Sequence, residues 1–245
     1  MNTLTDSVLT ALGLISSLDA ALWTVVLRSL AVSATATLLA YGLGLVLGAW
    51  LAVARFPGRG AVLVALNTSL ALPSVVVGLM VYLLLSRTGP LGFLGWLFSF
   101  KAMVVAQVML VVPVVTALTR QVVEDVERQH GEQWASLGAG PVFRSWLLAW
   151  DERYALLTIG VAAFGRAISE VGAVMIVGGN IDGFTRVMTT AIALETSKGD
   201  LPLALGLGLV LLAVVLLLNL LLAGLRRFGE RRQGLAVPSP KGWVA

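Results

Sequence analysis

Five long apolar stretches constrain the fold of this chain. They are Leu22–Ala54, Ala61–Ser86, about Phe98–Thr119, Tyr154–Gly178 and Leu201–Leu225. Each is close to or longer than the ~20 residues that a helix needs to cross a bilayer core of about 30 Å. Inside a bilayer every backbone amide must be hydrogen-bonded within the protein, which a helix achieves by itself. The sequence therefore predicts an all-α, polytopic membrane protein with about five transmembrane helices.

The composition excludes a soluble globular protein. Of the 245 residues, 58% are hydrophobic and 12% are charged, and the mean hydropathy is +0.93, whereas soluble domains are about 45–50% apolar and about 25% charged. The net charge of +4 does not indicate a nucleic-acid binder, because the cations lie between and after the apolar stretches and not in one basic patch. The chain contains no Cys, which excludes disulfides, a thiolate nucleophile and a Cys-based metal site.

The apolar stretches predict one membrane domain with two short ends. Residues 1–20 alternate apolar and polar side chains and carry no Lys or Arg, so we expect an outer N-terminal segment and not a cleavable signal peptide. Residues 21–228 are expected to form the transmembrane domain. Residues 229–245, which include Pro238 and Pro240, predict a flexible cytoplasmic tail.

The distribution of Lys and Arg predicts the orientation in the membrane. Short cationic loops are retained in the cytoplasm. With the N-terminus outside, eleven Lys and Arg residues fall in cytoplasmic segments and four in outer segments. The prediction is therefore N-terminus out and C-terminus in, with the polar segment 120–153 in the cytoplasm.

The charged segment Arg120–Arg153 is the longest interruption of the apolar pattern. A chain built for lipid has little reason to keep such a segment unless a partner binds it. We expect a short helix over Gln121–Gln129 that ends at Gly131. Glu132 then falls in the first turn of the next helix, where the positive end of the dipole favours a carboxylate.

An aromatic helix is expected to close this segment. Gly138 and Gly140 permit a sharp turn, and Pro141 suits the first position of a helix. Trp146 and Trp150 then recur at helical spacing. One interpretation is an interfacial linker, because Trp is enriched at the membrane surface. The other is a compact helix–turn–helix that projects from the bilayer and binds a partner.

The same segment resembles the EAA…LGA loop of ABC importer permeases, because Glu132 is followed by Leu137, Gly138 and Ala139 at offsets of five, six and seven residues. In that family the loop forms the coupling helices that insert into a groove on a cytoplasmic ATPase. The resemblance implies a set of ATPase-docking residues, which are Glu132, Ala135, Leu137, Gly138 and Ala139. Within this set the Glu makes polar contact with the ATPase and the Gly forms the turn. The chain departs from the family pattern at Gln133, Trp134, Trp150 and Asp151.

Three further stretches resemble the molybdate, sulfate and tungstate branch of these permeases. They are residues 72–78, residues 86–92, and the run 164–181 with its continuation 185–196. The last run is very similar to tungstate permeases of the TupB type. The resemblance implies the inner-membrane component of a binding-protein-dependent importer. It also implies the MetI-like, type I permease fold.

The same resemblance implies a set of partners. They are a second permease copy in a homodimer, two cytoplasmic ABC ATPase subunits, an extracytoplasmic oxyanion-binding protein and the lipid bilayer, with no nucleic acid. ATP and Mg bind to the ATPase, and no cofactor is expected in this chain. The sequence has no phosphate loop of the G-x-x-x-x-G-K-[ST] form, and its one His, His130, has no Cys or other His with which to form a metal site. We therefore expect a transport subunit of the cytoplasmic membrane and not an enzyme.

Two charges lie in the middle of the fourth apolar stretch. Arg166 and Glu170 are four residues apart and share a helical face. A charge at this depth costs about 2.5–3.5 kcal/mol on insertion scales, so a paired or pore-facing role is the first hypothesis. Either the two form a salt bridge that holds the helix against its neighbours, or they line the pathway and Arg166 meets a passing tetrahedral oxyanion.

Three more residues are candidates for the translocation pathway. Pro73 and Ser74 belong to a stretch that resembles the pathway segment of the second span in the family. Asn180 lies in the outer loop 178–200. Polar outer loops are often simply solvated, and the functional alternative is a rim that receives the binding protein.

The function that the resemblance implies is import of tungstate or a related oxyanion. Molybdate and sulfate share the charge and tetrahedral shape of tungstate, and this chain does not distinguish ions that another protein selects. A rival from another class is an ATP-independent secondary carrier or channel, and a third alternative is a membrane scaffold without transport. Five spans do not divide into two equal halves, which disfavours the inverted repeats of many secondary transporters.

Overall fold

The fold is that of a computed structural model, which describes residues 8–10, 12–13, 16–17, 19–136, 138 and 140–234. All regular secondary structure in these residues is helical, which confirms the predicted all-α class. The elements are α2 (Ala20–Val53), α3 (Arg59–Leu70), α4 (Ser74–Leu85), the 3-10 helix η1 (Gly92–Leu94), α5 (Phe100–Ser136), α6 (Pro141–Asp151), α7 (Arg153–Ile168), α8 (Gly172–Gly178), α9 (Met188–Lys198) and α10 (Leu201–Gly234).

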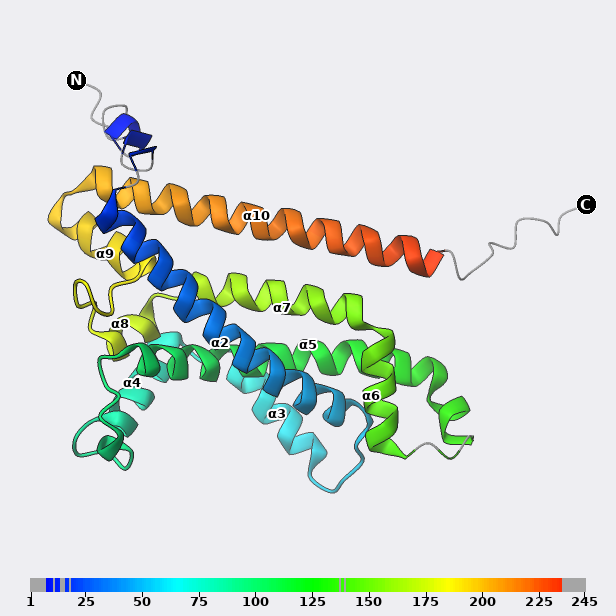
Figure 1. The fold of residues 1–245 in the computed structure, drawn as a ribbon. Helices are drawn as coiled ribbons and strands as arrows, with labels where there is room; N and C mark the ends of the chain where they lie inside the picture. Colours follow the sequence, from blue (N-terminus) through cyan, green and yellow to red (C-terminus); the bar gives the residue numbers. More distant parts are fainter. Residues whose placement is uncertain are drawn as a thin grey trace, which may run out of the picture.

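The long helices run along the length of the molecule (Figure 1). They are α2, α5, α7 and α10, and the short helix α6 lies across one end of them. Helices α8 and α9 lie at the opposite end, beside the start of α2. The two ends therefore carry different elements, as expected for a protein whose two sides face different compartments.

The packing of α2 against α5 is the most extensive helix contact in the described residues. It depends on two glycines that lie one helical turn apart on α2. A Cβ on Gly44 would lie 2.6 Å from Cβ of Val115, and a Cβ on Gly48 would lie 2.6 Å from the carbonyl oxygen of Thr116. Any larger residue would force the helices apart. Small residues spaced four apart are a common means of close helix packing in membranes.

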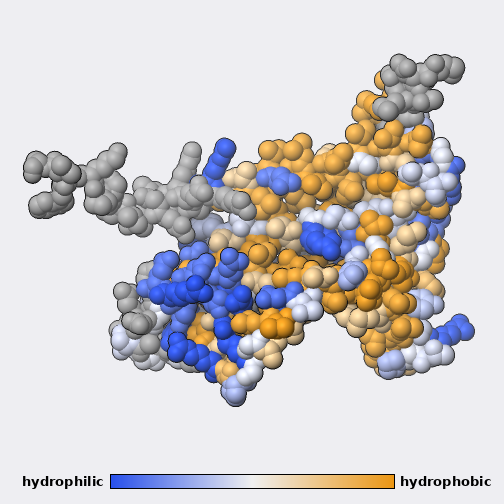
Figure 2. Space-filling view, turned by 180° about the vertical axis from the view of Figure 1, so that it is seen from behind, coloured by the Kyte–Doolittle hydropathy of each residue, from blue (hydrophilic) through white to orange (hydrophobic). Residues whose placement is uncertain are grey.

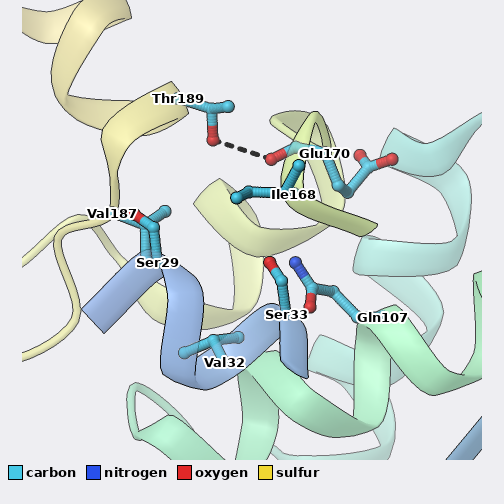
Figure 3. Close-up of a pocket in the computed structure, with 8 residues that line it drawn as sticks. All are labelled: Ser29, Val32, Ser33, Gln107, Ile168, Glu170, Val187 and Thr189. Carbon is cyan, nitrogen blue, oxygen red and sulfur yellow. Dashed lines mark hydrogen bonds between the residues drawn. The ribbon is translucent and has the colours of Figure 1, made fainter. Parts of the chain in front are cut away.

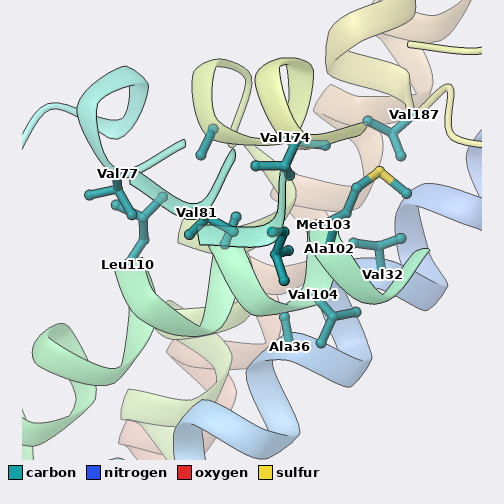
Figure 4. Packing of buried hydrophobic residues seen from close by; sticks show 14 residues of the cluster. Val32, Ala36, Val77, Val81, Ala102, Met103, Val104, Leu110, Val174 and Val187 are labelled. Carbon is teal, nitrogen blue, oxygen red and sulfur yellow. The ribbon is translucent and has the colours of Figure 1, made fainter. Parts of the chain in front are cut away.

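Four clusters of buried apolar residues surround this helix pair. The first joins α2 to α4, α5 and α8, with Met103 fully buried inside it (Figure 4). The second joins α2 to α9 and α10, the third joins it to α5 and α7, and the fourth joins it to α5 and α6. Helix α2 contributes to all four, through Val32, Val26, Ala40 and Ala49 respectively. It is therefore the element that connects the two ends of the fold.

The number of membrane spans agrees with the prediction, but two of the spans are bent. By length and composition, α2, α5 and α10 can each cross a membrane, and two bent helix pairs bring the number to five if each pair is one span. The predicted spans Ala61–Ser86 and Tyr154–Gly178 are not single straight helices, because α3 and α4 meet at 103° and α7 and α8 meet at 59°.

Each bend has a local cause. At the first, Pro73 has no amide hydrogen with which to continue the helical ladder, and it stands as the N-cap of α4. At the second, the Glu170 carboxylate accepts a hydrogen bond from the amide of Ala173 at 3.3 Å. A side-chain oxygen that takes a free amide at a helix start stabilises a new helix there.

The helix that follows the third apolar stretch is longer than predicted. Helix α5 continues through Gly131 to Ser136, so the expected end at Gly131 and the new helix at Glu132 are wrong. The reason is tertiary, because Val123 is fully buried and packs with Trp134 against α2 and α6. This packing outweighs the low helix propensity of one Gly, which is about 1 kcal/mol.

The predicted ends of the chain are only partly covered. Helix α10 runs to Gly234, past the predicted end of the fifth span at Leu225 and into the predicted tail. Residues 235–245 and most of residues 1–18 lie outside the described residues. The expected roles of both ends remain predictions.

The outer surface matches a lipid environment. Leu38, Val46 and Leu217 are 72%, 71% and 68% exposed, which is costly in water and favourable in hydrocarbon. Figure 2 shows a broad apolar surface along the long helices, with hydrophilic residues gathered at the end that holds α6 and the last turns of α5. This distribution supports a body within the bilayer and a polar end outside it.

The orientation can be tested directly because the chain contains no Cys. Single variants Arg55→Cys and Thr88→Cys place a thiol in exposed segments, before α3 and after α4 respectively. With the N-terminus outside, we expect a membrane-impermeant maleimide to label Thr88→Cys in intact cells and to label Arg55→Cys only after permeabilisation. The reverse labelling pattern would contradict the predicted orientation.

Candidate functional site

The bend between α7 and α8 contains an ion pair. The Arg166 guanidinium Nη1 lies 2.8 Å from Oε2 of Glu170. The Glu170 side chain is 4% exposed, while that of Arg166 is 44% exposed. A buried carboxylate thus anchors a guanidinium that still presents part of its surface. The salt bridge, one of the two alternatives that the sequence left open, is therefore formed. The pathway role of Arg166 remains a prediction.

Two backbone carbonyl groups at this bend accept hydrogen bonds from side chains of other helices, and that of Ala167 also accepts from the amide of Glu170 at 3.2 Å. Gln107 of α5 donates from Nε2 to the carbonyl oxygen of Ala167 at 2.9 Å. Thr189 of α9 donates from Oγ1 to the carbonyl oxygen of Glu170 at 2.7 Å. A backbone carbonyl group that has no hydrogen-bond partner inside a bilayer costs several kcal/mol. These two side chains therefore support the bend.

A small pocket lies beside the bend (Figure 3). It is lined by Ser29, Val32, Ser33, Gln107, Ile168, Glu170, Val187 and Thr189. Figure 3 shows Gln107 and Ser33 pointing into it from α5 and α2, with Glu170 above them. Oε1 of Gln107 is buried and has no hydrogen-bond partner among the described residues. The pocket is therefore polar on the side of α2 and α5.

Neither Gln107 nor Thr189 was predicted from the sequence as a site residue. Gln107 carried a usable signal, because it is a polar side chain near the middle of the apolar stretch Phe98–Thr119 and polar side chains at that depth need partners. Thr189 carried none, because a Thr in a helix commonly bonds its own backbone. Its partner 19 residues away is visible only in the folded chain.

The other predicted pathway residues fall into two groups. Ser74 lies close to the bend, since a Cβ on Gly172 would be 2.9 Å from its Oγ. Pro73 directly precedes it as the N-cap of α4. Asn180 lies beyond the other end of α8 and exchanges hydrogen bonds with Thr190, donating to its carbonyl oxygen at 3.3 Å and accepting from its hydroxyl at 2.9 Å. The structure therefore brings Pro73 and Ser74 to the bend and keeps Asn180 apart from it.

Helices α4 and α8 pack closely against each other. A Cβ on Gly78 would lie 2.7 Å from Cα of Ala173, and both residues are buried. The second halves of the two bent spans therefore form one packed unit. Each half is separated by a bend from the helix that precedes it.

A second polar cluster lies where α5 extends beyond the third apolar stretch. The Glu124 carboxylate lies 2.5 Å from the guanidinium of Arg59 and 2.6 Å from that of Arg120, with Arg128 at 4.0 Å. Arg59 also donates to the carbonyl oxygen of Leu51 at 3.0 Å. Glu124 thus ties α5 to the end of α2 and the start of α3.

The same extension of α5 is bound to α6. Arg144 of α6 forms an ion pair with Glu127 of α5, and both side chains are largely buried. Leu148 is 1% exposed in the fourth apolar cluster, where Trp134 also packs. Trp134, which departs from the family pattern of small residues, therefore contributes to the packing between α5 and α6.

The predicted docking residues are only partly described. Gly138 has φ of +77°, which supports the predicted turn, and Pro141 begins α6 as expected. Leu137 and Ala139 lie outside the described residues, as do the side chains of Glu132 and Ala135. Their role in docking remains a prediction.

The outer face of α6 is aromatic. Phe143, Trp146 and Trp150 are 56%, 61% and 59% exposed, and the two Trp rings stack with centroids 6.2 Å apart. The guanidinium of Arg153 lies 5.7 Å from the Trp150 ring centroid. The predicted aromatic stripe therefore exists as an exposed surface.

The corner between α6 and α7 holds two adjacent carboxylates. Burial raises the pKa of Glu152, and the neighbouring charge of Asp151 raises it further. Because the pKa is raised in the folded state, the contribution of Glu152 to stability is present below its unfolded-state pKa and is lost as the pH rises.

Among the described residues no group of three or more His, Cys, Asp or Glu side chains is arranged to hold a metal ion.

Comparison with known proteins places the chain in a family, although no family model matches it. The tungstate uptake system permease protein TupB of Peptoclostridium acidaminophilum is 40% identical over 216 residues, which cover 88% of this chain and 95% of that protein. A probable anion ABC transporter permease protein of Haloferax volcanii is 40% identical over 211 residues, or 84% of this chain and 90% of the relative. The chain belongs to the TupB-type family of ABC transporter permeases.

A more distant relative shows the breadth of this family. The molybdenum transport system permease protein ModB of Escherichia coli (strain K12) is 31% identical over 230 residues, or 86% of this chain and 96% of that protein. The predicted family and the predicted transport role are confirmed. The chain is a multi-pass permease subunit of the cytoplasmic membrane and not itself an enzyme. Its relatives are named as permease proteins of an uptake system, an ABC transporter and a transport system.

The Glu124 cluster generates a prediction about stability. Replacement of Glu124 by Gln leaves the partly buried Arg59 and Arg120 without their carboxylate, so we expect the free energy of unfolding to fall by about 1–3 kcal/mol. Arg128, whose side chain is 74% exposed, contributes little. Thermal unfolding of the purified permease in detergent measures the effect.

The control for this prediction is Asp125→Asn. It removes a carboxylate at the adjacent, exposed position of the same helix and is expected to leave the melting temperature nearly unchanged. Equal effects of the two variants would show that the cluster does not stabilise this end of the fold.

Proposed function

We propose that this chain is the membrane-spanning permease of an ATP-driven importer for tungstate or a related tetrahedral oxyanion. The observation that carries the proposal is the 40% identity to a tungstate permease over 88% of this chain. Because the similarity extends through almost the whole relative, it includes the bent spans and the segment 120–153 together. A second relative of equal identity is named for anion transport.

The bend between α7 and α8 is the proposed contact point for the ion. Arg166 presents a partly exposed guanidinium at mid-span, and the buried Glu170 holds it in place. A guanidinium matches the oxygens of an oxyanion in geometry and charge. The carboxylate partner weakens the net positive field, which suits a conduit that must release the ion it admits.

The proposed assembly contains two copies of this chain. Arg166 lies on the surface of a single copy with its side chain 44% exposed, so a second copy facing it would enclose the pathway. Two ATPase subunits would bind the segment 120–153, with Glu132, Ala135, Leu137, Gly138 and Ala139 in contact. An external oxyanion-binding protein would bind on the opposite side. There the segment 178–200, which was expected to be a loop but contains α9, forms the proposed rim with Asn180.

The proposed ATPase contact fits the way this segment is built. Ion pairs of Glu124 and Glu127 join α5 to α3 and α6, and the fourth apolar cluster fills the space between them. A partner that moves α6 therefore moves α5 with it. ATP hydrolysis would shift the equilibrium between inward-facing and outward-facing states through differences in binding energy.

Molybdate is the second candidate cargo, because a permease named for molybdenum transport is 31% identical over 86% of this chain. Sulfate has the same shape and charge. We assign the selection among these ions to the binding protein. The sequence of the permease then does not determine which ion is transported.

Reconstitution tests the proposed cargo and the energy source. We expect liposomes that contain the permease, its ATPase and its binding protein to accumulate tungstate only with ATP. In competition, molybdate should inhibit in proportion to its affinity for the binding protein, as calorimetry on that protein measures it. Accumulation without the ATPase would overturn the ABC importer and favour a secondary carrier.

Substitution of the ion pair tests the proposed pathway. We expect Arg166→Gln and Glu170→Gln to lower the rate of uptake about tenfold or more, since each removes a charge-assisted contact, while the ATPase still co-purifies. Arg87→Gln, at an exposed residue of an outer loop, serves as the control. Uptake at the wild-type rate by both pair variants would contradict a pathway role.

A further inference from the structure

We propose that Gln107 and Thr189 are positioning residues that hold the bend between α7 and α8, and with it the Arg166–Glu170 pair, in one geometry. The part that concerns transport depends on the proposed function. The part that concerns the bend depends on the structure alone.

The first contact is made by Gln107 from α5. Gln107 is 4% exposed, and its Nε2 lies 2.9 Å from the carbonyl oxygen of Ala167. A carbonyl oxygen only accepts, so the amide nitrogen must face α7 and Oε1 must face the pocket. In a continuous helix the amide of residue 171 would bond to Ala167. Here the chain turns after Ile168, and the amide of Glu170 bonds to the carbonyl oxygen of Ala167 at 3.2 Å instead. Gln107 adds a second hydrogen bond to this oxygen from α5, at the point where the ladder of α7 ends.

The second contact is made by Thr189 from α9. Its hydroxyl donates to the carbonyl oxygen of Glu170 at 2.7 Å, and the residue is 8% exposed. The preceding residue, Met188, donates its amide to Oγ of Ser29 on α2 at 2.6 Å. Thr189 thus holds the backbone of Glu170 from an element that is itself bound to α2.

Together the two contacts connect the bend to the α2–α5 pair. Ala167 is bound from α5 and Glu170 is bound from the start of α9. Arg166 directly precedes the first of these positions, and the paired carboxylate belongs to the second. On the other side of the bend, α8 packs against α4 through Gly78 and Ala173. The two hydrogen bonds thus hold the end of α7 and the residues that lead into α8, and we expect a change in the angle between α7 and α8 to strain them.

Three variants and a control test the proposal. Thr189→Val keeps the shape and removes the hydroxyl, Thr189→Ser keeps the hydroxyl, and Gln107→Leu removes the amide at similar volume. Thr35→Val is the matched control, because the Thr35 hydroxyl bonds only within its own helix, to Ala31. Thr189→Ser provides rescue by the conservative change.

The first measurement is hydrogen–deuterium exchange of the full-length permease in lipid nanodiscs. We expect the amides of residues 168–173 to exchange about fivefold faster in Thr189→Val and in Gln107→Leu, as the loss of one ordinary hydrogen bond implies. Thr189→Ser and Thr35→Val should exchange like the wild type. Unchanged exchange in both test variants would overturn the proposal.

The second measurement is tungstate uptake by the reconstituted complex. A positioning role predicts a lower maximal rate for Thr189→Val with an unchanged half-saturating concentration of loaded binding protein, and recovery in Thr189→Ser. Faster exchange with uptake at the wild-type rate would overturn the positioning role. Failure of the wild-type complex to import tungstate would refute the proposed function and leave the exchange result to decide on the bend.

Discussion

The close approach of α2 and α5 is the constraint on which the rest of the structure depends. Gly44 and Gly48 allow the two backbones to meet, and any Cβ at these positions would collide with Val115 or Thr116. Lipid tails are as apolar as the helices, so packing and not the hydrophobic effect must hold membrane helices together. The four apolar clusters are all built on α2, and each would lose its common support if this contact opened.

The packed pair of α2 and α5 supports two other spans that are bent. A bend exposes backbone groups that lipid cannot satisfy, so it persists only where the protein supplies partners. At the bend between α7 and α8 these partners are Gln107 and Thr189, and the carboxylate of Glu170 supplies another for the start of α8. The same bend carries the half-exposed Arg166. Irregular backbone and a charged side chain thus lie together at the proposed ion contact.

Helix α5 is long enough to extend beyond the bilayer core. With 37 residues it is about 55 Å long, which exceeds a bilayer core of about 30 Å. One part of it bonds to the bend through Gln107, and the other joins α3 and α6 through Glu124 and Glu127. A single helix, with Pro113 inside it between the two parts, therefore links the proposed ATPase contact to the proposed ion contact.

The sequence by itself determined the helical class, the membrane location and the approximate spans, because hydropathy and helical spacing are local properties. For Arg166 and Glu170 it left a salt bridge and a pathway role as alternatives, and the structure shows the salt bridge. The sequence also predicted the turn at Gly138 and the helix start at Pro141. The two bends, the continuation of α5 through Gly131 and the contacts of Gln107 and Thr189 were decided by the tertiary structure. Each depends on which helices pack together. The hydropathy of an apolar stretch is the same whether its helix is straight or bent. A helix continues through a Gly when neighbouring helices bury the residues around it. Partners far apart in sequence, such as Glu170 and Thr189, become neighbours only when the helices have packed.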